Sequence, residues 1–219
     1  MISILMPIYN GINFIEESVS SVLKQTYVNW ELIIGINGHP ANSPVYQIAK
    51  EYELKSNRIR VIDYVGIKGK PNALNEMVKE CNGQYIALLD VDDIWHEKKL
   101  EIQSNKMIEY DVIGTRCVYF GDLNGIVPDI PTGDISNFNF KIVNPIINSS
   151  SLILKELCWW DPNCFVEDYD LWIRLREKRR TFFNFSDVLV KHRIHNESAF
   201  NSKGNHSHVH KLRRVTNSS

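Results

Sequence analysis

The first 90 residues alternate between short apolar runs and amphipathic stretches, and no other feature constrains the fold as strongly. The apolar runs lie at residues 2–6, 30–36, 58–64 and 85–89, and the stretches between them have helical periodicity. The run at 85–89 is apolar at every position, as a strand must be when helices cover both faces of its sheet. This order predicts an α/β fold with a parallel, doubly wound sheet that binds a nucleotide.

The rhythm changes after Trp95. We expect a helix over about 97–107, a strand over 112–120, and a hairpin and loop over 121–134. A further strand should follow the mixed segment 144–154. The last clear helix is expected over about 167–178 and the final strand over about 188–193. Neither a repeat nor a linker divides the chain, and from Asn196 onward it is polar.

Composition excludes several other classes of protein. The 219 residues carry 25 Lys and Arg against 26 Asp and Glu, so a general polybasic surface for nucleic acid or membranes is not expected. The four cysteines have no CxxC spacing and fit reduced core thiols in a cytoplasmic protein. The first apolar run stops at Pro7, too soon for a signal sequence or a membrane span.

Three carboxylates, Asp90, Asp92 and Asp93, follow the most buried predicted strand. Open α/β sheets bind ligands beyond the carboxyl ends of their strands. Closely spaced carboxylates repel one another unless a cation compensates, and Mg²⁺ or Mn²⁺ takes oxygen ligands that it shares with phosphates. Continued strand alternation would place Asp90 and Asp92 on one side and Asp93 on the other. The alternative is a solvated turn in which Asp93 caps the next helix.

Asp168 stands in the first turn of the last predicted helix, on the same face as Leu171, Trp172 and Leu175. A carboxylate on an apolar face is costly unless it has a partner or a role. Apolar neighbours would raise its pKa, while the helix N-terminus would lower it. The alternative is an acid bound by backbone amides where the helix begins.

Two cationic segments offer contacts for an anion. Residues 66–73 form a glycine-spaced loop that contains Lys70 and leads into a helix, where free amides attract a diphosphate. The loop is neither a P-loop nor a dinucleotide motif. In the final strand, alternation puts Arg193 and His195 on one side, toward a diphosphate or a metal. A solvated turn and a structural histidine are the alternatives.

Five segments in order resemble the family 2 glycosyltransferases over about residues 1–200. These enzymes have the GT-A fold, a Rossmann-like and mostly parallel sheet flanked by helices, with a small antiparallel portion on the acceptor side. The resemblance therefore implies one domain over 1–200, with a nucleotide-sugar-binding half at 1–95, an acceptor and catalytic half at 96–200, and a polar tail at 201–219. The segments are Pro7-Ile8-Tyr9-Asn10; Gln25-Thr26-Tyr27 with Trp30-Glu31-Leu32-Ile33-Ile34; Leu89-Asp90-Val91-Asp92-Asp93-Ile94-Trp95 with Lys99-Leu100-Glu101-x-Gln103; Glu167-Asp168-x-Asp170-Leu171-Trp172-x-Arg174-Leu175; and Arg193-Ile194-His195-x-x-Ser198.

The resemblance also implies a role for each matching residue. Asp168 would be the general base that takes the proton of the acceptor hydroxyl. Asp92 and His195 would hold Mn²⁺ or Mg²⁺ at the donor diphosphate. The remaining matches would bind the donor: Pro7 and Tyr9 at the nucleoside, Asp90 at the ribose, Asp93 near the sugar, Lys70 and Asn72 along the donor, and Arg193 near the diphosphate.

The implied activity is metal-dependent, inverting transfer of a sugar from a nucleoside-diphosphate sugar to a hydroxyl of a glycan or glycoconjugate. Family members usually end the second strand with an acidic pair whose first acid reads uracil. This chain has Gly35-Ile36-Asn37-Gly38 there, so Asn37 would supply part of the hydrogen bonding to an expected UDP-sugar. The motifs define neither the donor sugar nor the acceptor. An enzyme without a membrane span is compatible with a whole protein or with one module of a larger glycosyltransferase.

Two other functions stay open at this point. A sugar-1-phosphate nucleotidyltransferase usually carries a glycine-rich basic segment after its first strand, where this chain has Tyr9-Asn10-Gly11. A non-catalytic module that binds sugar nucleotides or glycans would fit the missing acid of the second strand. The presence of both Asp92 and Asp168 argues against such a module.

Overall fold

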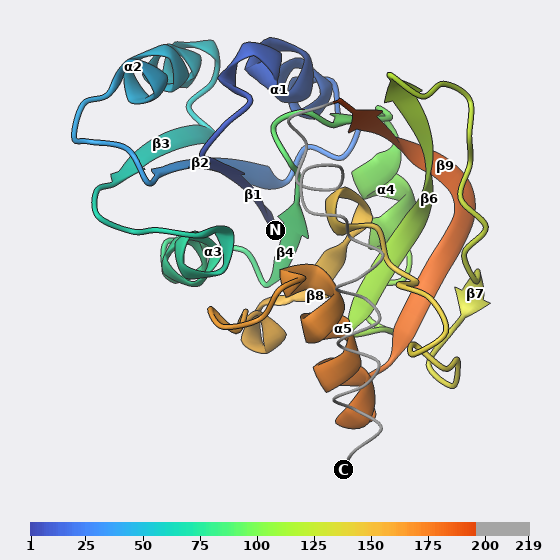
Figure 1. The fold of residues 1–219 in the computed structure, drawn as a ribbon. Coiled ribbons are helices and arrows are strands. Elements are labelled where there is room, and N and C mark those ends of the chain that lie inside the picture. The colour runs from blue at the N-terminus through green and yellow to red at the C-terminus, as the bar shows by residue number, and fades with distance from the viewer. Residues whose placement is uncertain (196–219) are drawn as a thin grey trace.

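The computed structural model describes residues 1–195 and centres on one nine-stranded sheet (Figure 1). The strand order is β3-β2-β1-β4-β8-β6-β9-β5, and β7 pairs with β9. The strands are β1 (Ile2–Ile8), β2 (Trp30–Asn37), β3 (Ile59–Tyr64), β4 (Tyr85–Leu88), β5 (Ile94–Trp95), β6 (Val112–Gly121), β7 (Gly133–Asp134), β8 (Leu152–Leu154) and β9 (Phe182–Ile194). The helices are α1 (Ile15–Leu23), α2 (Pro44–Lys50), α3 (Lys70–Lys79), α4 (Lys99–Ser104) and α5 (Glu167–Glu177), with short 3₁₀ turns η1 (Ile12–Phe14), η2 (Glu51–Lys55), η3 (Asn148–Ser150) and η4 (Lys155–Leu157).

The first half has the predicted parallel arrangement. β1 pairs in parallel with β2 and β4, and β2 pairs in parallel with β3. Parallel neighbours need crossover connections, and α1, α2 and α3 supply them. α1 and α2 cover one face of the sheet, and α3 covers the other (Figure 1). The carboxyl ends of these strands therefore meet at one edge.

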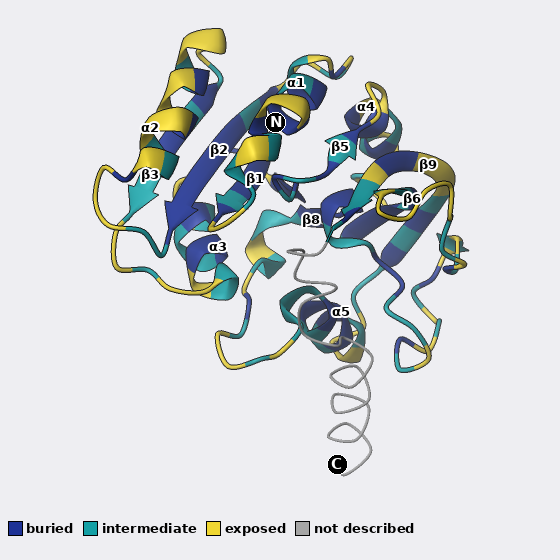
Figure 2. Ribbon diagram, turned by 45° about the horizontal axis from the view of Figure 1, so that its top comes forward, coloured by how far each residue is buried: buried dark blue, intermediate teal, exposed yellow. Residues whose placement is uncertain are grey.

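Side chains on both faces of the parallel strands are buried. In β1, Ile4 and Met6 belong to the cluster beneath α1 and α2, whereas Leu5 packs with Leu74 of α3 on the other face. α5 contributes to that second cluster. Figure 2 shows buried strands at the centre and exposed residues on the outer sides of α1 and α2. This double burial explains why the strand sequences are continuously apolar.

The second half departs from the expected boundaries. β8 lies antiparallel to both β4 and β6, and so joins the two parts of the sheet. β9 runs parallel to β6 and begins at Phe182, earlier than the predicted 188. Its early part contains polar residues, but Asn184 is fully buried, and an irregularity opposite residues 115–117 of β6 interrupts the alternation. Periodicity breaks at such a bulge, which is why the sequence pattern missed this part of the strand.

Three other predicted elements are corrected. The helix expected over 97–107 is regular only from Lys99 to Ser104 and continues as turns. The stretch of helical periodicity between the apolar runs at 30–36 and 58–64 divides into α2 and η2. In place of the hairpin expected at 121–134, the chain reverses between Tyr119 and Ile126: the N–H of Gly125 donates to the carbonyl of Tyr119, and the N–H of Tyr119 donates to the carbonyl of Ile126. β7 pairs with β9.

All four cysteines are free thiols. Over residues 1–195, we find no helix with the length and apolar character needed to cross a bilayer. The tail at 201–219 and Ser198 of the last motif lie outside the described residues.

Candidate active site

The three aspartates that follow β4 form a turn at the carboxyl edge of the parallel strands. β4 ends at Leu88, and the amide of Asp93 donates a hydrogen bond to the carbonyl of Asp90 at 3.0 Å. Strand alternation therefore does not continue, and the expectation of Asp90 and Asp92 on one strand face was wrong. Each carboxylate instead has its own partners from a different part of the chain.

Asp90 lies between α3 and η3. One carboxylate oxygen is 2.6 Å from the ammonium of Lys70, and the other accepts a hydrogen bond of 2.9 Å from the amide of Asn148. Ser149 accepts the backbone N–H of Asp90 at 3.1 Å. Burial alone would raise the pKa of this carboxyl, but Lys70 and Asn148 together hold it below its usual value. Asp90 is therefore an anion at neutral pH.

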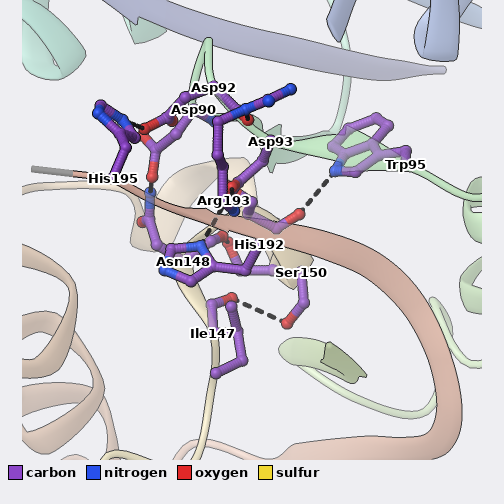
Figure 3. Close-up of polar contacts among 12 residues, drawn as sticks. Asp90, Asp92, Asp93, Trp95, Ile147, Asn148, Ser150, His192, Arg193 and His195 are labelled. Atoms are coloured by element: carbon purple, nitrogen blue, oxygen red, sulfur yellow. Dashed lines mark hydrogen bonds and ion pairs between the residues drawn. The ribbon is translucent and has the colours of Figure 1, made fainter. Parts of the chain in front are cut away.

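Asp92 and His195 face one another across 2.9 Å, between Oδ2 and Nε2 (Figure 3). Both side chains are 20% exposed. Burial raises the pKa of Asp92, and the carboxylates of Asp93 and Asp90 add to that effect. An additional positive charge would relieve this repulsion.

A carboxylate oxygen beside an imidazole nitrogen is a donor set that Mn²⁺ accepts, so Asp92 and His195 fit the metal implied by the resemblance. Within the described part of the chain, no group of three or more His, Cys, Asp or Glu side chains is placed to hold an ion. A bound ion would therefore need further oxygen ligands from phosphate or water, as Mg²⁺ sites commonly do.

Asp93 is fully buried and binds β9. Its oxygens contact the His192 ring nitrogen Nδ1 at 3.0 Å and accept the Arg193 backbone N–H at 2.9 Å. Burial would lower the pKa of His192, but the Asp93 carboxylate and its acidic neighbours outweigh burial and raise it to about 9. The structure thus gives Asp93 no exposed oxygen for a donor sugar. It also does not cap the next helix, because α4 begins only at Lys99.

Lys70 links the acidic turn to α5. Its ammonium lies 2.6 Å from Asp90 and 3.2 Å from Glu167 (Oε1). Burial would lower the pKa of Lys70, but these two carboxylates outweigh burial and raise it. The neighbouring Asn72 is exposed and donates a hydrogen bond of 2.9 Å to the carbonyl of Lys68. The predicted cationic loop therefore reaches the acidic turn through Lys70, while Asn72 stabilises the loop.

Asp168 is half-buried at the start of α5, and the helix buries Leu171, Trp172 and Leu175 as predicted. One oxygen of Asp168 accepts the backbone N–H of Tyr169 at 2.7 Å, and the other lies 3.4 Å from the amide of Asn144. The contact with a backbone amide at the start of the helix, which was the alternative interpretation of this acid, is therefore present.

Burial is the main cause that raises the pKa of Asp168 to about 7, and the adjacent Glu167 carboxylate is the second. Lys70 and the two hydrogen bonds oppose them. An acid with this pKa exchanges its proton readily at neutral pH, as a general base must.

The expected nucleoside-binding residues lie at the ends of β1 and β2. Pro7 is half-buried in β1, while Tyr9 is 57% exposed and its carbonyl accepts a hydrogen bond of 2.6 Å from His39. The Tyr9 ring packs against Gly38, which has a φ of +76° and where an added Cβ would lie 2.7 Å from the ring. Asn37, at the end of β2, is only 3% exposed.

Asp63 of β3, which the sequence patterns did not indicate, lies beside Ile36 of β2, the position where family members usually have an acid. Ile36 fills that position and is fully buried, and its register partner on β3 is Asp63. One oxygen of Asp63 accepts the backbone N–H of Asn42 at 2.9 Å. The other is buried without a hydrogen-bond partner among residues 1–195.

A buried polar network supports η3 from behind. The indole N–H of Trp95 donates to the carbonyl of Ser149 at 2.7 Å, and Gln103 donates to that of Ser150 at 2.8 Å. The fully buried Lys99 donates to Gln103 at 2.7 Å and lies 4.0 Å above the Trp95 ring. Asn148 was not predicted as a partner of Asp90, and its only sequence signal is its place in the mixed segment 144–154.

Comparisons with known proteins point to one family of enzymes. The sequence profile of "Glycosyl transferase family 2" matches residues 3–182. WfgD of Escherichia coli, a UDP-Glc:alpha-D-GlcNAc-diphosphoundecaprenol beta-1,3-glucosyltransferase, is 30% identical over 93% of this chain and 81% of its own length. The uncharacterized glycosyltransferase MJ1057 of Methanocaldococcus jannaschii is 32% identical over 93% of this chain and 74% of its own. The uncharacterized glycosyltransferase RC0461 of Rickettsia conorii is 30% identical over 94% of this chain and 36% of its own length. This chain therefore spans only about a third of that relative.

Two solved structures share the fold. TarS of S. aureus, solved in complex with UDP-GlcNAc, superposes with a TM-score of 0.72 at 19% identity, over 98% of this chain and 65% of TarS. The mannosyltransferase PcManGT from Pyrobaculum calidifontis, solved in complex with GDP-Man and Mn²⁺, superposes with a TM-score of 0.68 at 14% identity. The superposition covers 97% of this chain and 60% of PcManGT. The fold is thus the expected GT-A, Rossmann-like fold. With the profile match over most of its length, the chain belongs to glycosyl transferase family 2.

Proposed function

We propose that this chain is a metal-dependent, inverting glycosyltransferase that moves a sugar from a nucleoside-diphosphate sugar, with a UDP-sugar as first candidate, to a hydroxyl of a glycan or glycoconjugate. The observation that carries the proposal is the position of Lys70 between Asp90 and Glu167. These two ion pairs hold the acidic turn close to the start of α5. Asp168, next to Glu167, is therefore close to the carboxylates expected at the donor.

Asp168 is the proposed general base. A hydroxyl group has a pKa far above 7, so it attacks poorly unless a neighbouring group removes its proton. A positioned carboxylate contributes about 10²–10⁴-fold to such a step. The acceptor oxygen would bond to the anomeric carbon while the bond to the diphosphate breaks, and Asp168 would take the hydroxyl proton. One base and direct displacement give inversion at that carbon.

The donor would lie along the carboxyl edge of β1, β2 and β4. Asp92 and His195 would hold Mn²⁺ or Mg²⁺, which neutralises charge on the departing diphosphate when bound. Asp90 would accept a hydrogen bond from the ribose, and Lys70 would add positive charge beside the phosphates. Pro7, Tyr9 and Asn37 would line the nucleoside, and Asn72 would keep the lysine loop in place. The four free cysteines support a cytoplasmic location.

The alternatives have less support. Membership of glycosyl transferase family 2 favours sugar transfer over nucleotidyl transfer. A module that only binds sugars has no use for a half-buried carboxyl with a pKa of about 7. Because the chain spans 36% of the Rickettsia conorii relative, we also propose that it acts as one module of a larger glycosyltransferase.

The test begins with binding. A panel of nucleotide sugars is screened by thermal shift with and without Mn²⁺, because a ligand that binds the folded state raises its apparent stability. We expect a UDP-sugar to stabilise the wild type, and more strongly with Mn²⁺. Asp92→Ala should remove the effect of Mn²⁺. If no nucleotide sugar stabilises the protein, the proposed function is wrong.

Catalysis is then measured as release of the nucleoside diphosphate from the donor that binds. Asp168→Asn should retain donor binding and lose turnover by about 10²–10⁴-fold. Glu177→Gln, an exposed position at the end of the same helix, is the matched control and should keep both. Full turnover in Asp168→Asn would remove this residue from the mechanism. Turnover that requires pyrophosphate would instead support the nucleotidyltransferase.

A further inference from the structure

Arg193 was expected to face the donor diphosphate, but its side chain is held inside the protein. The residue is the second-last of β9, and its side chain is only 13% exposed. Its guanidinium lies 4.3 Å from the ring centres of both Phe14 and Phe120. Two aromatic faces around one cation remove it from water and restrict its orientation.

The polar contacts of Arg193 are with protein groups of the acidic turn and α1. Its Nε donates to the backbone carbonyl of Asp92 at 2.9 Å, and its Nη2 lies 2.9 Å from a carboxylate oxygen of Glu17. Its backbone N–H donates to Asp93, also at 2.9 Å. Figure 3 shows Arg193 reaching from β9 alongside the turn, between Asp92 and Asp93.

These contacts have a direct consequence for the proposed metal pair. The carbonyl that accepts from Arg193 belongs to Asp92 itself, and His195 follows Arg193 by two residues, directly after the end of β9. Arg193 thus restrains the backbone of Asp92 and the backbone that leads to His195, and these two residues make the 2.9 Å contact. Glu17 balances its charge, so a phosphate would first have to displace a carboxylate from it.

We propose that Arg193 is a positioning residue that holds Asp92 and His195 in place to bind the divalent cation, and that Glu17 of α1 keeps Arg193 in position. It does not contact the donor diphosphate. This inference rests on the proposed function, because it assumes that Asp92 and His195 bind the ion. It assigns a role to Glu17, a 52% exposed carboxylate on a helix that carries no proposed ligand.

The variants separate this role from phosphate binding. Glu17→Gln removes the charge that orients Arg193 without touching the donor site, and its exposed position makes misfolding an unimportant risk. Arg193→Lys keeps the positive charge but loses the planar arrangement of donors that reaches both Asp92 and Glu17. Glu16→Gln is the matched control, because Glu16 is the preceding residue of α1 and pairs with Lys55 and Tyr52 instead.

Binding of UDP is measured by calorimetry, with Mn²⁺ and with EDTA. We expect Glu17→Gln and Arg193→Lys to weaken the Mn²⁺-dependent binding by about tenfold or more, the usual effect of losing a group that orients a metal ligand. Binding of UDP in EDTA should stay within about twofold of the wild type, and Glu16→Gln should change neither value. The double variant should be no weaker than Arg193→Lys alone, because both substitutions remove one interaction.

Three results would overturn the inference. If Arg193→Lys weakens UDP binding in EDTA while Glu17→Gln does not, Arg193 contacts the phosphates. If neither variant changes the Mn²⁺-dependent binding, Arg193 does not position the metal pair. If the wild type itself binds UDP equally well with and without Mn²⁺, the metal dependence in the proposed function fails and this inference fails with it.

Discussion

The most direct test of the proposed base is the substitution of its neighbour, Glu167→Gln. Glu167 is the second cause, after burial, of the raised pKa of Asp168, and Lys70 opposes both. The substitution removes a negative charge beside Asp168 and leaves the Lys70 ammonium with Asp90 as its remaining ion-pair partner. Both effects favour the ionised form of Asp168, so its pKa should fall.

The size of this change follows from Coulomb's law. A unit charge roughly 8–10 Å away contributes about 2 kcal/mol at an effective dielectric constant of about 20, which corresponds to roughly 1 to 1.5 pH units. At pH 6 a carboxyl with a pKa of about 7 is about one-tenth ionised. In Glu167→Gln the ionised fraction at pH 6 should reach about one half or more.

The assay is a pH titration of side-chain carboxyl carbons by ¹³C NMR, with the Asp168 signal assigned by its loss in Asp168→Asn. This measurement needs neither donor nor acceptor, so an unknown acceptor does not limit it. Glu76→Gln is the control and should leave the Asp168 titration unchanged, because Glu76 of α3 has a side chain that is 39% exposed and pairs with Lys79. The reasoning is refuted if Asp168 of the wild type titrates near 4, or if its pKa does not fall in Glu167→Gln.

Three further predictions concern stability, measured by urea denaturation. Because the pKa of Asp168 rises on folding from 3.8 to about 7, its ionised form destabilises the folded state. The free energy of unfolding of Asp168→Asn should match that of the wild type at pH 4 and exceed it by up to about 4 kcal/mol at pH 8. An equal difference at both pH values would contradict this. Burial holds the pKa of Lys99 well below its usual value. The wild type should therefore gain stability relative to Lys99→Met between pH 7 and pH 9, by at most about 1.4 kcal/mol per pH unit. If the stabilities of the two proteins change equally with pH, the pKa of Lys99 is not lowered. Gly38→Ala should lose about 1–3 kcal/mol of stability from its positive φ, and further stability because the new Cβ displaces Tyr9. Gly66→Ala should show the backbone cost alone, because Gly66 has a φ of +81° and its added Cβ would meet nothing within 4 Å. Equal losses of stability in the two variants would mean that the Tyr9 contact is unimportant.

Much of the parallel half could be predicted from the sequence because its strands are buried on both faces. The runs at 2–6, 30–36 and 85–89 have no polar residue that would allow another arrangement, apart from Ser3 and Glu31 near the strand beginnings. Ser3 and Glu31 bond to each other at 2.6 Å, so these two polar groups satisfy one another within the sheet. Local pattern and tertiary structure therefore agree in this part of the chain.

Predictions failed where distant contacts override a local pattern. The acidic residues after β4 were expected to continue the alternation of a strand, but each is held by a different distant partner: Lys70, His195 and His192. Nothing within the four residues of the turn specifies those partners. β9 was predicted too short because its early polar residues include Asn184, which donates to the carbonyls of Pro131 and Pro145 inside the protein. A buried asparagine with backbone partners looks like a loop residue in the sequence.

The candidate site also divides into residues that a local pattern indicates and residues whose contacts depend on distant parts of the chain. The residues proposed to supply the chemistry, Asp90, Asp92 and Asp168, could be selected because three carboxylates crowd the end of a buried strand and one lies on the apolar face of a helix. The residues that orient them could not. Asn148 and Asn144 are ordinary polar residues of an irregular segment, and their contacts with Asp90 and Asp168 depend on how β8 joins the two parts of the sheet.

The pairing of Asp92 with His195 spans 103 positions of the chain and has a consequence for how the protein matures. A ribosome that has completed the acidic turn must still synthesise a hundred residues before the imidazole is available. If Asp92 and His195 hold the divalent ion as we propose, the acidic turn lacks one of its two protein ligands until then. Tight uptake of the ion then marks the last stage of folding, and a stalled or shortened chain is recognisable by its failure to take up manganese.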